Sequence, residues 1–239
     1  MYRKINFKIW RVVLCIIIFG SYLATLNASA ATRFTTTYDT WTDNFDSVSL
    51  NSRWSWIRED PTHWNLTSNP GYLRIITQQG GLIDIGGTAK NILLTAAPIG
   101  RYQITTRVTI TPTENFQGAA IFVYQDDDNY LTIARRYGNE NKVSLRKEVN
   151  GVQTTLEVLE AATTLYLRID RNGDTYTGTY STDGIVWINI GGFDLTFNSP
   201  KVGIGSQGGT SLIEIPSDFD FFQLVDYTNH LFLPLTSKK

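Results

Sequence analysis

Hydrophobic and polar residues alternate with a period of two along much of the chain. In the segment 102–110, Tyr102, Ile104, Thr106, Val108 and Ile110 share one face, whereas polar residues occupy the other. This period is typical of a β-strand that is buried on one side only. Eleven strands are predicted, at residues 72–77, 92–96, 102–111, 119–125, 130–136, 143–149, 165–170, 175–180, 186–190, 202–206 and 219–225.

Short turn motifs separate these segments. They are DDDN at 126–129, YGNEN at 137–141, VNG at 149–151, RNGD at 171–174 and STDG at 181–184. Closely spaced hairpins indicate antiparallel pairing, and no long stretch has helical periodicity; only residues 157–162 are expected to form one helical turn. The predicted fold class is therefore all-β, with two antiparallel sheets packed face to face as a β-sandwich.

The first thirty residues have the pattern of a signal peptide. Four basic residues precede an apolar run at 12–19, and Ala-Ser-Ala at 28–30 fits a cleavage site. The apolar stretch is shorter than the roughly 20 residues that span a bilayer, so no stable membrane span is expected after cleavage, although retention as an anchor is an alternative. We expect a secreted or cell-surface protein with a linker at 31–40, one domain at 41–227 and a tail at 228–239.

Charge and cysteine content exclude several classes of protein. The segment 1–30 holds four of the 21 basic residues and no acidic residue, so the remainder carries a net charge of −5. No basic run offers a path for phosphates, and nucleic acid is not an expected partner. The single cysteine, Cys15, lies in the signal segment, so the domain must be held together without disulfides.

Candidate catalytic groups do not form a recognisable motif. A glycosidase needs two carboxyl groups that face each other, but the glutamates are scattered over turns and different strands. A fold that brought two carboxylates together in a cleft, for example those of Glu59 and Glu214, would change this interpretation. The two histidines, His63 and His230, have no nucleophile motif beside them. No catalytic residue is predicted.

Carboxylate and amide oxygens could hold a hard cation such as calcium. The motifs TDNFD at 42–46 and SDFDFF at 217–222 are better candidates than DDDN at 126–129, since acidic residues at a hairpin tip are usually just solvated. Asp218 and Asp220 share a strand face, and the first and last strands of a sandwich commonly lie side by side. A structural calcium site between these strands is therefore a hypothesis.

The order of several motifs resembles a known domain family. These motifs are DNFDSVSLNSRWSWIREDPTHWNLTSNPGYLRI, then FQGAAIFVYQDDDNYLTIARRYG, YSTDGIVWINIG and SDFDFF. The chain from about Trp41 to Val225 resembles the concanavalin A-like jelly roll at the C-terminus of family 43 glycoside hydrolases of the β-xylosidase type. In that family the sandwich follows a propeller that carries the catalytic acids, and no propeller is seen in this sequence. The resemblance implies an accessory domain without hydrolase activity.

The same resemblance implies a structural calcium ion between the terminal strands. Its ligands would be Asp43 or Asn44 at the start, with Asp220 or Asp218 at the end. Asn44 stands where the family frequently has aspartate. Calcium is the only cofactor that we expect.

The aromatic stretch at 54–64 admits two interpretations. Trp54 and Trp56 share a strand face and could pack between the sheets. Alternatively, Trp56 or Trp64, with Arg58 and Tyr124, could line an open sheet face and stack on a sugar ring, because aromatic faces suit the apolar side of a pyranose.

The sequence therefore favours a secreted, non-catalytic, lectin-like module that binds a polysaccharide or glycan. One alternative is a structural or protein-binding β-sandwich of the cell envelope with an envelope protein as its partner. A second alternative is a glycoside hydrolase that acts on plant or cell-wall polysaccharide.

Overall fold

The computed structural model describes residues 38–81 and 87–227, which form fifteen strands in two antiparallel sheets. The eight-stranded sheet contains β1 (Asp39–Asp43), β3 (Trp64–Asn65), β4 (Leu73–Ile76), β6 (Tyr102–Ile110), β11 (Thr164–Asn172), β12 (Thr175–Ser181), β13 (Ile188–Asp194) and β15 (Pro216–Asp226). The seven-stranded sheet contains β2 (Ser55–Ile57), β5 (Ile92–Ala96), β7 (Gly118–Asp126), β8 (Asn129–Tyr137), β9 (Asn141–Val149), β10 (Val152–Leu159) and β14 (Lys201–Gln207). The predicted all-β sandwich is confirmed.

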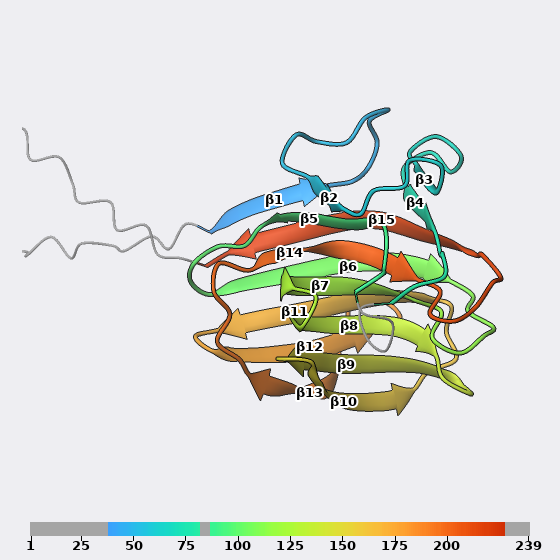
Figure 1. Cartoon of the computed structure of the whole chain (residues 1–239). Helices are drawn as coiled ribbons and strands as arrows, with labels where there is room; N and C mark the ends of the chain where they lie inside the picture. The colour runs from blue at the N-terminus through green and yellow to red at the C-terminus, as the bar shows by residue number, and fades with distance from the viewer. Residues whose placement is uncertain (1–37, 82–86, 228–239) are drawn as a thin grey trace, which may run out of the picture. The chain divides into compact units, whose positions relative to one another are not determined.

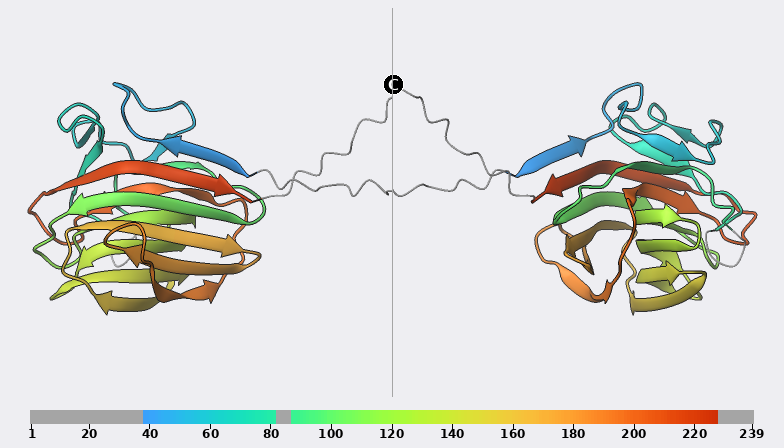
Figure 2. Two further views of the ribbon diagram at one scale, coloured as in Figure 1. Left: turned by 180° about the vertical axis from the view of Figure 1, so that it is seen from behind. Right: turned by 60° about the vertical axis from the view of Figure 1, so that its left-hand side comes forward.

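The strand order brings distant parts of the chain together. The eight-stranded sheet runs β13-β12-β11-β6-β15-β4-β3, with β1 also paired to β15, and the seven-stranded sheet runs β10-β9-β8-β7-β14-β5-β2. Strands β1 and β15 lie side by side in Figure 1, as expected for the first and last strands. The turned view in Figure 2 shows the two sheets as separate layers.

The main core lies between the sheets and follows the period of two. Tyr102, Ile104 and Val108 of β6 are fully buried, as the alternation predicts. From the opposite sheet, Ile121 and Val123 of β7 belong to the same cluster. Burying this apolar surface is the main contribution to the stability of a domain without disulfides.

The prediction of a helical turn at 157–162 is wrong. Residues up to Leu159 belong to β10, which pairs with β9 along its whole length. Leu156 and Val158 pack against the main core, whereas Glu157 points to the other side of the sheet. The polar residues of this short segment resemble a helix surface, and they mask its period of two in the sequence.

The expected domain boundaries fall partly outside the described residues. The signal peptide at 1–30 and the tail at 228–239 are not described, and strand β1 starts at Asp39, two residues before the expected start of the domain. Within residues 38–81 and 87–227, no helix is long and apolar enough to cross a membrane.

Candidate functional site

A second apolar cluster covers the side of the seven-stranded sheet that faces away from the main core, here called the outer face. Along β7, Ala120, Phe122 and Tyr124 belong to this cluster, and they alternate with Ile121 and Val123 of the main core. Since neighbouring residues of a strand point to opposite faces, the two clusters lie on opposite sides of one sheet. The outer face is therefore not the solvated polar surface that a half-buried sheet usually presents.

The outer face contains a shallow hollow, here called the outer-face pocket, whose cavity volume is about 30 Å³; the larger volume of about 420 Å³ around it includes open solvent. The residues that line this outer-face pocket are Gly118, Ala120, Phe122, Tyr130, Thr132, Ala134, Arg136, Ser144, Arg146, Gly205 and Gln207. Small side chains form much of this lining, and a Cβ atom added at Gly118 would lie 2.9 Å from the Cβ atom of Arg136. The glycine therefore leaves room for the arginine side chain beside the hollow.

Charged side chains border one end of this pocket. The Nη2 atom of Arg136 lies 3.0 Å from Glu157, and the Nζ atom of Lys142 lies 2.6 Å from the same carboxylate. The hydrogen bond from Lys142 is the main reason that the pKa of Glu157 is lowered, and the Arg136 pair adds to it. The Nε atom of Arg136 is buried and has no hydrogen-bond acceptor among the described residues.

Two further polar contacts hold the neighbouring strands in place. The hydroxyl group of Tyr130 donates to Glu148 over 2.8 Å, and both residues are buried. The Nε atom of Arg146 donates to the hydroxyl oxygen of Thr155 over 3.1 Å. These contacts fix the aromatic ring and the guanidinium group in defined positions along the pocket.

Two of the predicted sugar-binding residues come together at another part of the outer face. Arg58 makes a bidentate ion pair with Asp127, with N–O distances of 2.8 and 2.9 Å, and also donates to the carbonyl oxygen of Ala89. The hydroxyl group of Tyr124 donates to Asp127 over 2.8 Å. Burial, together with this hydrogen bond, raises the pKa of Tyr124. Tyr124 is cross-strand partner to Tyr130, so it extends the aromatic surface of the pocket.

The other two predicted sugar-binding residues lie elsewhere. Trp56 pairs with Leu93, a main-core residue, so its indole points to the inner side of the sheet. Its ring centroid is 5.0 Å from that of Trp64, whose indole nitrogen donates to Glu59. Trp54 also packs against the main core. The structure therefore supports core packing for Trp56 and does not place Trp56 and Trp64 with Arg58 and Tyr124.

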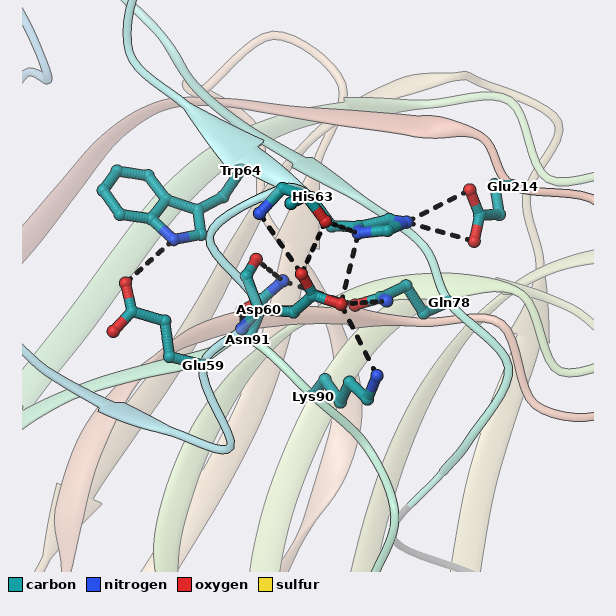
Figure 3. A network of polar contacts seen from close by, with 9 residues as sticks. Glu59, Asp60, His63, Trp64, Gln78, Lys90, Asn91 and Glu214 are labelled. Atoms are coloured by element: carbon teal, nitrogen blue, oxygen red, sulfur yellow. Dashed lines mark hydrogen bonds and ion pairs between the residues drawn. The ribbon is translucent and has the colours of Figure 1, made fainter.

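A polar network that was not predicted surrounds Asp60 (Figure 3). His63 lies 3.3 Å from Asp60 through Nδ1 and 3.2 Å from Glu214 through Nε2. Gln78 donates to Asp60 over 2.8 Å. Hydrogen bonds, first from Thr62 and then from Gln78, hold the pKa of Asp60 well below its usual range. Nothing in the sequence signals this contact, because 151 residues separate His63 from Glu214.

This network lacks the geometry for nucleophilic catalysis. The hydroxyl group of Thr62 lies 2.8 Å from His63 Nδ1, but it also lies 2.6 Å from the carboxylate of Asp60, which can only accept its proton. The histidine therefore does not act as a base toward this hydroxyl group. Glu59 and Glu214 lie at opposite ends of the network in Figure 3, with Asp60 and His63 between them, so they do not face each other as a glycosidase pair.

The two acidic residues of β15 that were expected to bind calcium form ion pairs with arginines. Asp218 accepts two hydrogen bonds of 2.7 Å from Arg74, and Asp220 lies 2.9 Å from the Nη1 atom of Arg107. Each guanidinium group supplies the positive charge that a cation would supply, so this arrangement does not fit a calcium ion. Nowhere in the described part of the chain do three or more His, Cys, Asp or Glu side chains gather closely enough to hold a metal ion.

The start of the chain also differs from the expected calcium geometry. Asp43 pairs with the main-core residue Phe222 and accepts the indole N–H group of Trp54 over 2.8 Å, so its side chain points inward. Asn44 is exposed. Asp218 lies on the other side of the strand from its core neighbour Phe219. The side chains of Asp43 and Asp218 thus point to opposite faces of the sheet, although strands β1 and β15 are adjacent.

Comparison with known proteins places this architecture in a family. Residues 42–223 match the family described as the beta-xylosidase C-terminal concanavalin A-like domain. A protein of Escherichia coli (strain K12) that carries a beta-xylosidase name is 25% identical over 185 residues, which cover 71% of this chain and 32% of that protein.

Solved structures agree with the family match. The GH43 protein BlXynB from Bacillus licheniformis is 27% identical with a TM-score of 0.74, and the match covers 78% of this chain and 39% of that chain. Xylan beta-1,4-xylosidase from Bacillus halodurans C-125 shares the fold at 18% identity, with a TM-score of 0.67 and coverage of 77% and 38%. The chain thus spans well under half the length of these relatives. It belongs to the beta-xylosidase C-terminal concanavalin A-like domain family.

Proposed function

We propose that this protein is a non-catalytic carbohydrate-binding module and that the outer-face pocket is its binding site. The observation that carries the proposal is the composition of the pocket. Small residues form its floor, the nearly buried rings of Phe122 and Tyr130 line it, and Arg136 and Gln207 supply polar groups. Ligand pockets generally combine apolar surface with a few fixed polar groups in this way.

The pocket chemistry matches a sugar ring. An aromatic side chain can contact the apolar face of a pyranose, whereas hydroxyl and amide groups can bond to its hydroxyl groups. Thr132 and Ser144 place two hydroxyl groups in the pocket lining. Tyr130 is held by its bond to Glu148, which lowers the conformational entropy that the protein loses on binding.

The relatives favour polysaccharides as ligands. One carries a beta-xylosidase name and another is named xylan beta-1,4-xylosidase. Their chains are much longer than the matched region. From their names we therefore take only the class of substrate, a polysaccharide, and not the enzymatic activity. Together with the signal-like first thirty residues, it favours a secreted or cell-surface module that holds plant or cell-wall polysaccharide.

Thermal unfolding with oligosaccharides tests the proposal. At ten times the dissociation constant, a ligand of the native state adds about 1.4 kcal/mol, or an increase of about 3–6 °C in Tm for a domain of this size. Oligosaccharides of xylan, arabinan and β-glucan are the probes. The Ala134→Phe variant fills the pocket and should lose the increase. Thr177→Phe, on the outer side of the other sheet, is its control and should keep the increase. An unchanged Tm with all three probes would contradict the proposal.

One observation favours a second candidate, a protein-binding module. Beside Trp187, the side chains of Ile185, Val186 and Ile188 are 82%, 65% and 45% exposed. A contiguous exposed apolar segment is typical of a protein interaction surface. Replacing Ile185 and Val186 by Ser should leave sugar-induced shifts in Tm unchanged, and it should abolish pull-down of an envelope protein if this candidate holds.

A further inference from the structure

Strand β10 has a free edge that is long and regular. It ends the seven-stranded sheet (Figure 1) and, within the described part of the chain, pairs with β9 alone, over eight residues without a register shift. The other strands at the sheet edges are shorter or irregular: β1, β2 and β3 have five, three and two residues, and the pairing of β13 with β12 contains a register shift. An open edge such as that of β10 is a template for pairing with another chain.

The edge of β10 lacks the features that usually prevent such pairing, which are proline, lysine and bulges. Its sequence, VQTTLEVL, contains none of them, and its only charged residue, Glu157, already pairs with Arg136 and Lys142. Two large apolar side chains at its ends, Val152 and Leu159, are 68% and 64% exposed. Both the backbone and the side chains of this strand are therefore open to a partner.

The hydrogen-bond pattern shows which backbone groups point to the free edge. The two-residue turn at 150–151 has positive φ at both positions, as in a type I′ hairpin, so Val152 forms a hydrogen-bonded pair with β9. At the other end, the N–H group of Glu160 donates to the carbonyl oxygen of Asn141 on the β9 side. Even-numbered residues thus bond to β9. The backbone groups of the odd-numbered residues from 153 to 159 point outward.

From this geometry we infer that two copies of this chain form a dimer by antiparallel pairing of their β10 edges. With Thr155 opposite its own copy, the outward groups of residues 153–157 form about six hydrogen bonds around a twofold axis. In this register Gln153 faces Glu157 of the other copy, so each carboxylate meets an amide that can donate to it. A register that placed Glu157 opposite itself would bring two like charges together.

The same register covers the exposed apolar ends of the strand. Val152 lies opposite Val158 of the other copy, and both side chains are on the inner side of the sheet. Leu159 lies opposite Gly151, where the absence of a side chain leaves open space. Removing these apolar side chains from water favours association. A second copy of the strand therefore complements this edge at its centre and at both ends.

The dimer has a consequence for the outer-face pockets. Its twofold axis is perpendicular to the sheet, so the two seven-stranded sheets join into one and both pockets lie on the same side. Five strand spacings separate the two β8 strands, which corresponds to about 24 Å. One polysaccharide chain can then contact both pockets. This consequence rests on the proposed function, whereas the dimer does not.

Sedimentation velocity of the purified protein tests the dimer. A single pair of strands is a small interface, so we expect a reversible monomer–dimer equilibrium with a dissociation constant of about 10–100 µM. Over the same concentrations, amide hydrogen exchange at Gln153, Thr155 and Glu157 should slow, because their N–H groups become hydrogen-bonded in the dimer.

The charge at position 153 tests the register. Gln153→Lys places a cation opposite Glu157 of the other copy and should strengthen the dimer about fivefold, whereas Gln153→Glu should weaken it about fivefold. The difference should shrink in about 1 M salt, because ionic strength screens these charges. Thr40→Lys and Thr40→Glu, at an exposed position of β1 in the other sheet, are the matched controls and should leave the dissociation constant unchanged.

A proline at the centre of the edge tests the backbone pairing. Thr155→Pro removes the outward N–H group next to the twofold axis and leaves the hydrogen bonds to β9 in place, so it should weaken the dimer more than about tenfold. Circular dichroism shows whether this variant folds. If it does not, the two variants at position 153 decide.

The outcomes distinguish this dimer from other arrangements. A protein that stays monomeric up to about 500 µM would overturn the inference. A dimer that none of the β10 variants affects would also overturn it, since its interface would lie elsewhere. Equal effects of Gln153→Lys and Gln153→Glu would overturn the register centred on Thr155. Outward amides that slow only when another protein is added would show that the edge binds a segment of that protein, and the dimer would be wrong.

Discussion

The outer sides of the two sheets differ in how they use their polar groups. On the eight-stranded sheet, polar and charged groups pair with one another: Arg74 pairs with Asp218, Arg107 pairs with Asp220, and Gln103 donates to Asp170. On the seven-stranded sheet, an apolar cluster and a pocket occupy the corresponding side, and a buried nitrogen of Arg136 lacks an acceptor. The same alternating strands thus produce one surface held by ion pairs and one surface with an apolar cluster and a hollow.

The two sides should differ most in the loss of unfolding free energy when an aromatic side chain is removed from each of them. Tyr130 is 1% exposed and bonded to Glu148, so Tyr130→Ala leaves a cavity and a buried carboxylate without this donor. We expect a loss of about 3–5 kcal/mol in the free energy of unfolding, measured by denaturant titration. Tyr166 is partly exposed on the other side, and Tyr166→Ala should cost only about 1 kcal/mol. Similar losses for both variants would contradict the contrast.

A smaller difference is expected between the coupling free energies of two ion pairs, one on each side. The side chains of Arg74 and Asp218 are 27% and 15% exposed, whereas those of Arg58 and Asp127 are 32% and 34% exposed. A double-mutant cycle with Gln and Asn replacements should give about 1–2 kcal/mol for the first pair and about 0.5–1 kcal/mol for the second. A larger coupling for Arg58 and Asp127 would reverse the order that burial predicts.

A smaller effect concerns pH and the pocket border. The folded protein lowers the pKa of Glu157 below its ordinary value of 4.5, so its contribution to stability is present above that pH and is lost as the pH falls through the folded pKa. Unfolding curves between pH 7 and 3 should therefore fall less steeply for Glu157→Gln than for the wild type. Glu140→Gln, at an exposed turn position, is the control and should follow the wild type. Equal slopes for all three proteins would exclude a contribution from Glu157.

The smallest effect should come from removing calcium. Because Arg74 and Arg107 already balance the carboxylates of Asp218 and Asp220, adding a chelator should change Tm by less than about 1 °C. Differential scanning calorimetry with and without calcium is the measurement. An increase of several degrees with calcium would revive the ion site expected from the sequence.

Periodicity predicted most of the strands because it reflects local geometry. The alternation at 102–110 translates directly into the one-sided burial of β6. No strand was predicted where β10 lies, and at its C-terminal end Glu157 and Glu160 suggested a helix surface instead of a strand edge. A short polar edge strand carries a weak apolar signal, and its pairing with β9 decides its structure.

The site was less predictable because it depends on register and on side-chain parity. Arg58 and Tyr124 both bond to Asp127, and the sequence does not reveal this shared partner. Trp56 was assigned to two faces as alternatives, and its pairing with Leu93 selects the inner one. The pocket itself brings together β7, β8, β9 and β14, and no single segment of sequence carries its pattern.

The position of the last two strands has a consequence for how the chain can fold. Strand β14 lies between β5 and β7, and β15 lies between β4 and β6, so each sheet receives a central strand only from residues 201–226. Until those residues are available, four earlier strands have open edges and the pocket lacks part of its floor. Pairing over such long sequence distances is slow, and unpaired edges promote aggregation. Folding of this domain should therefore be completed late during synthesis, and a helper that shields open strand edges should raise its yield.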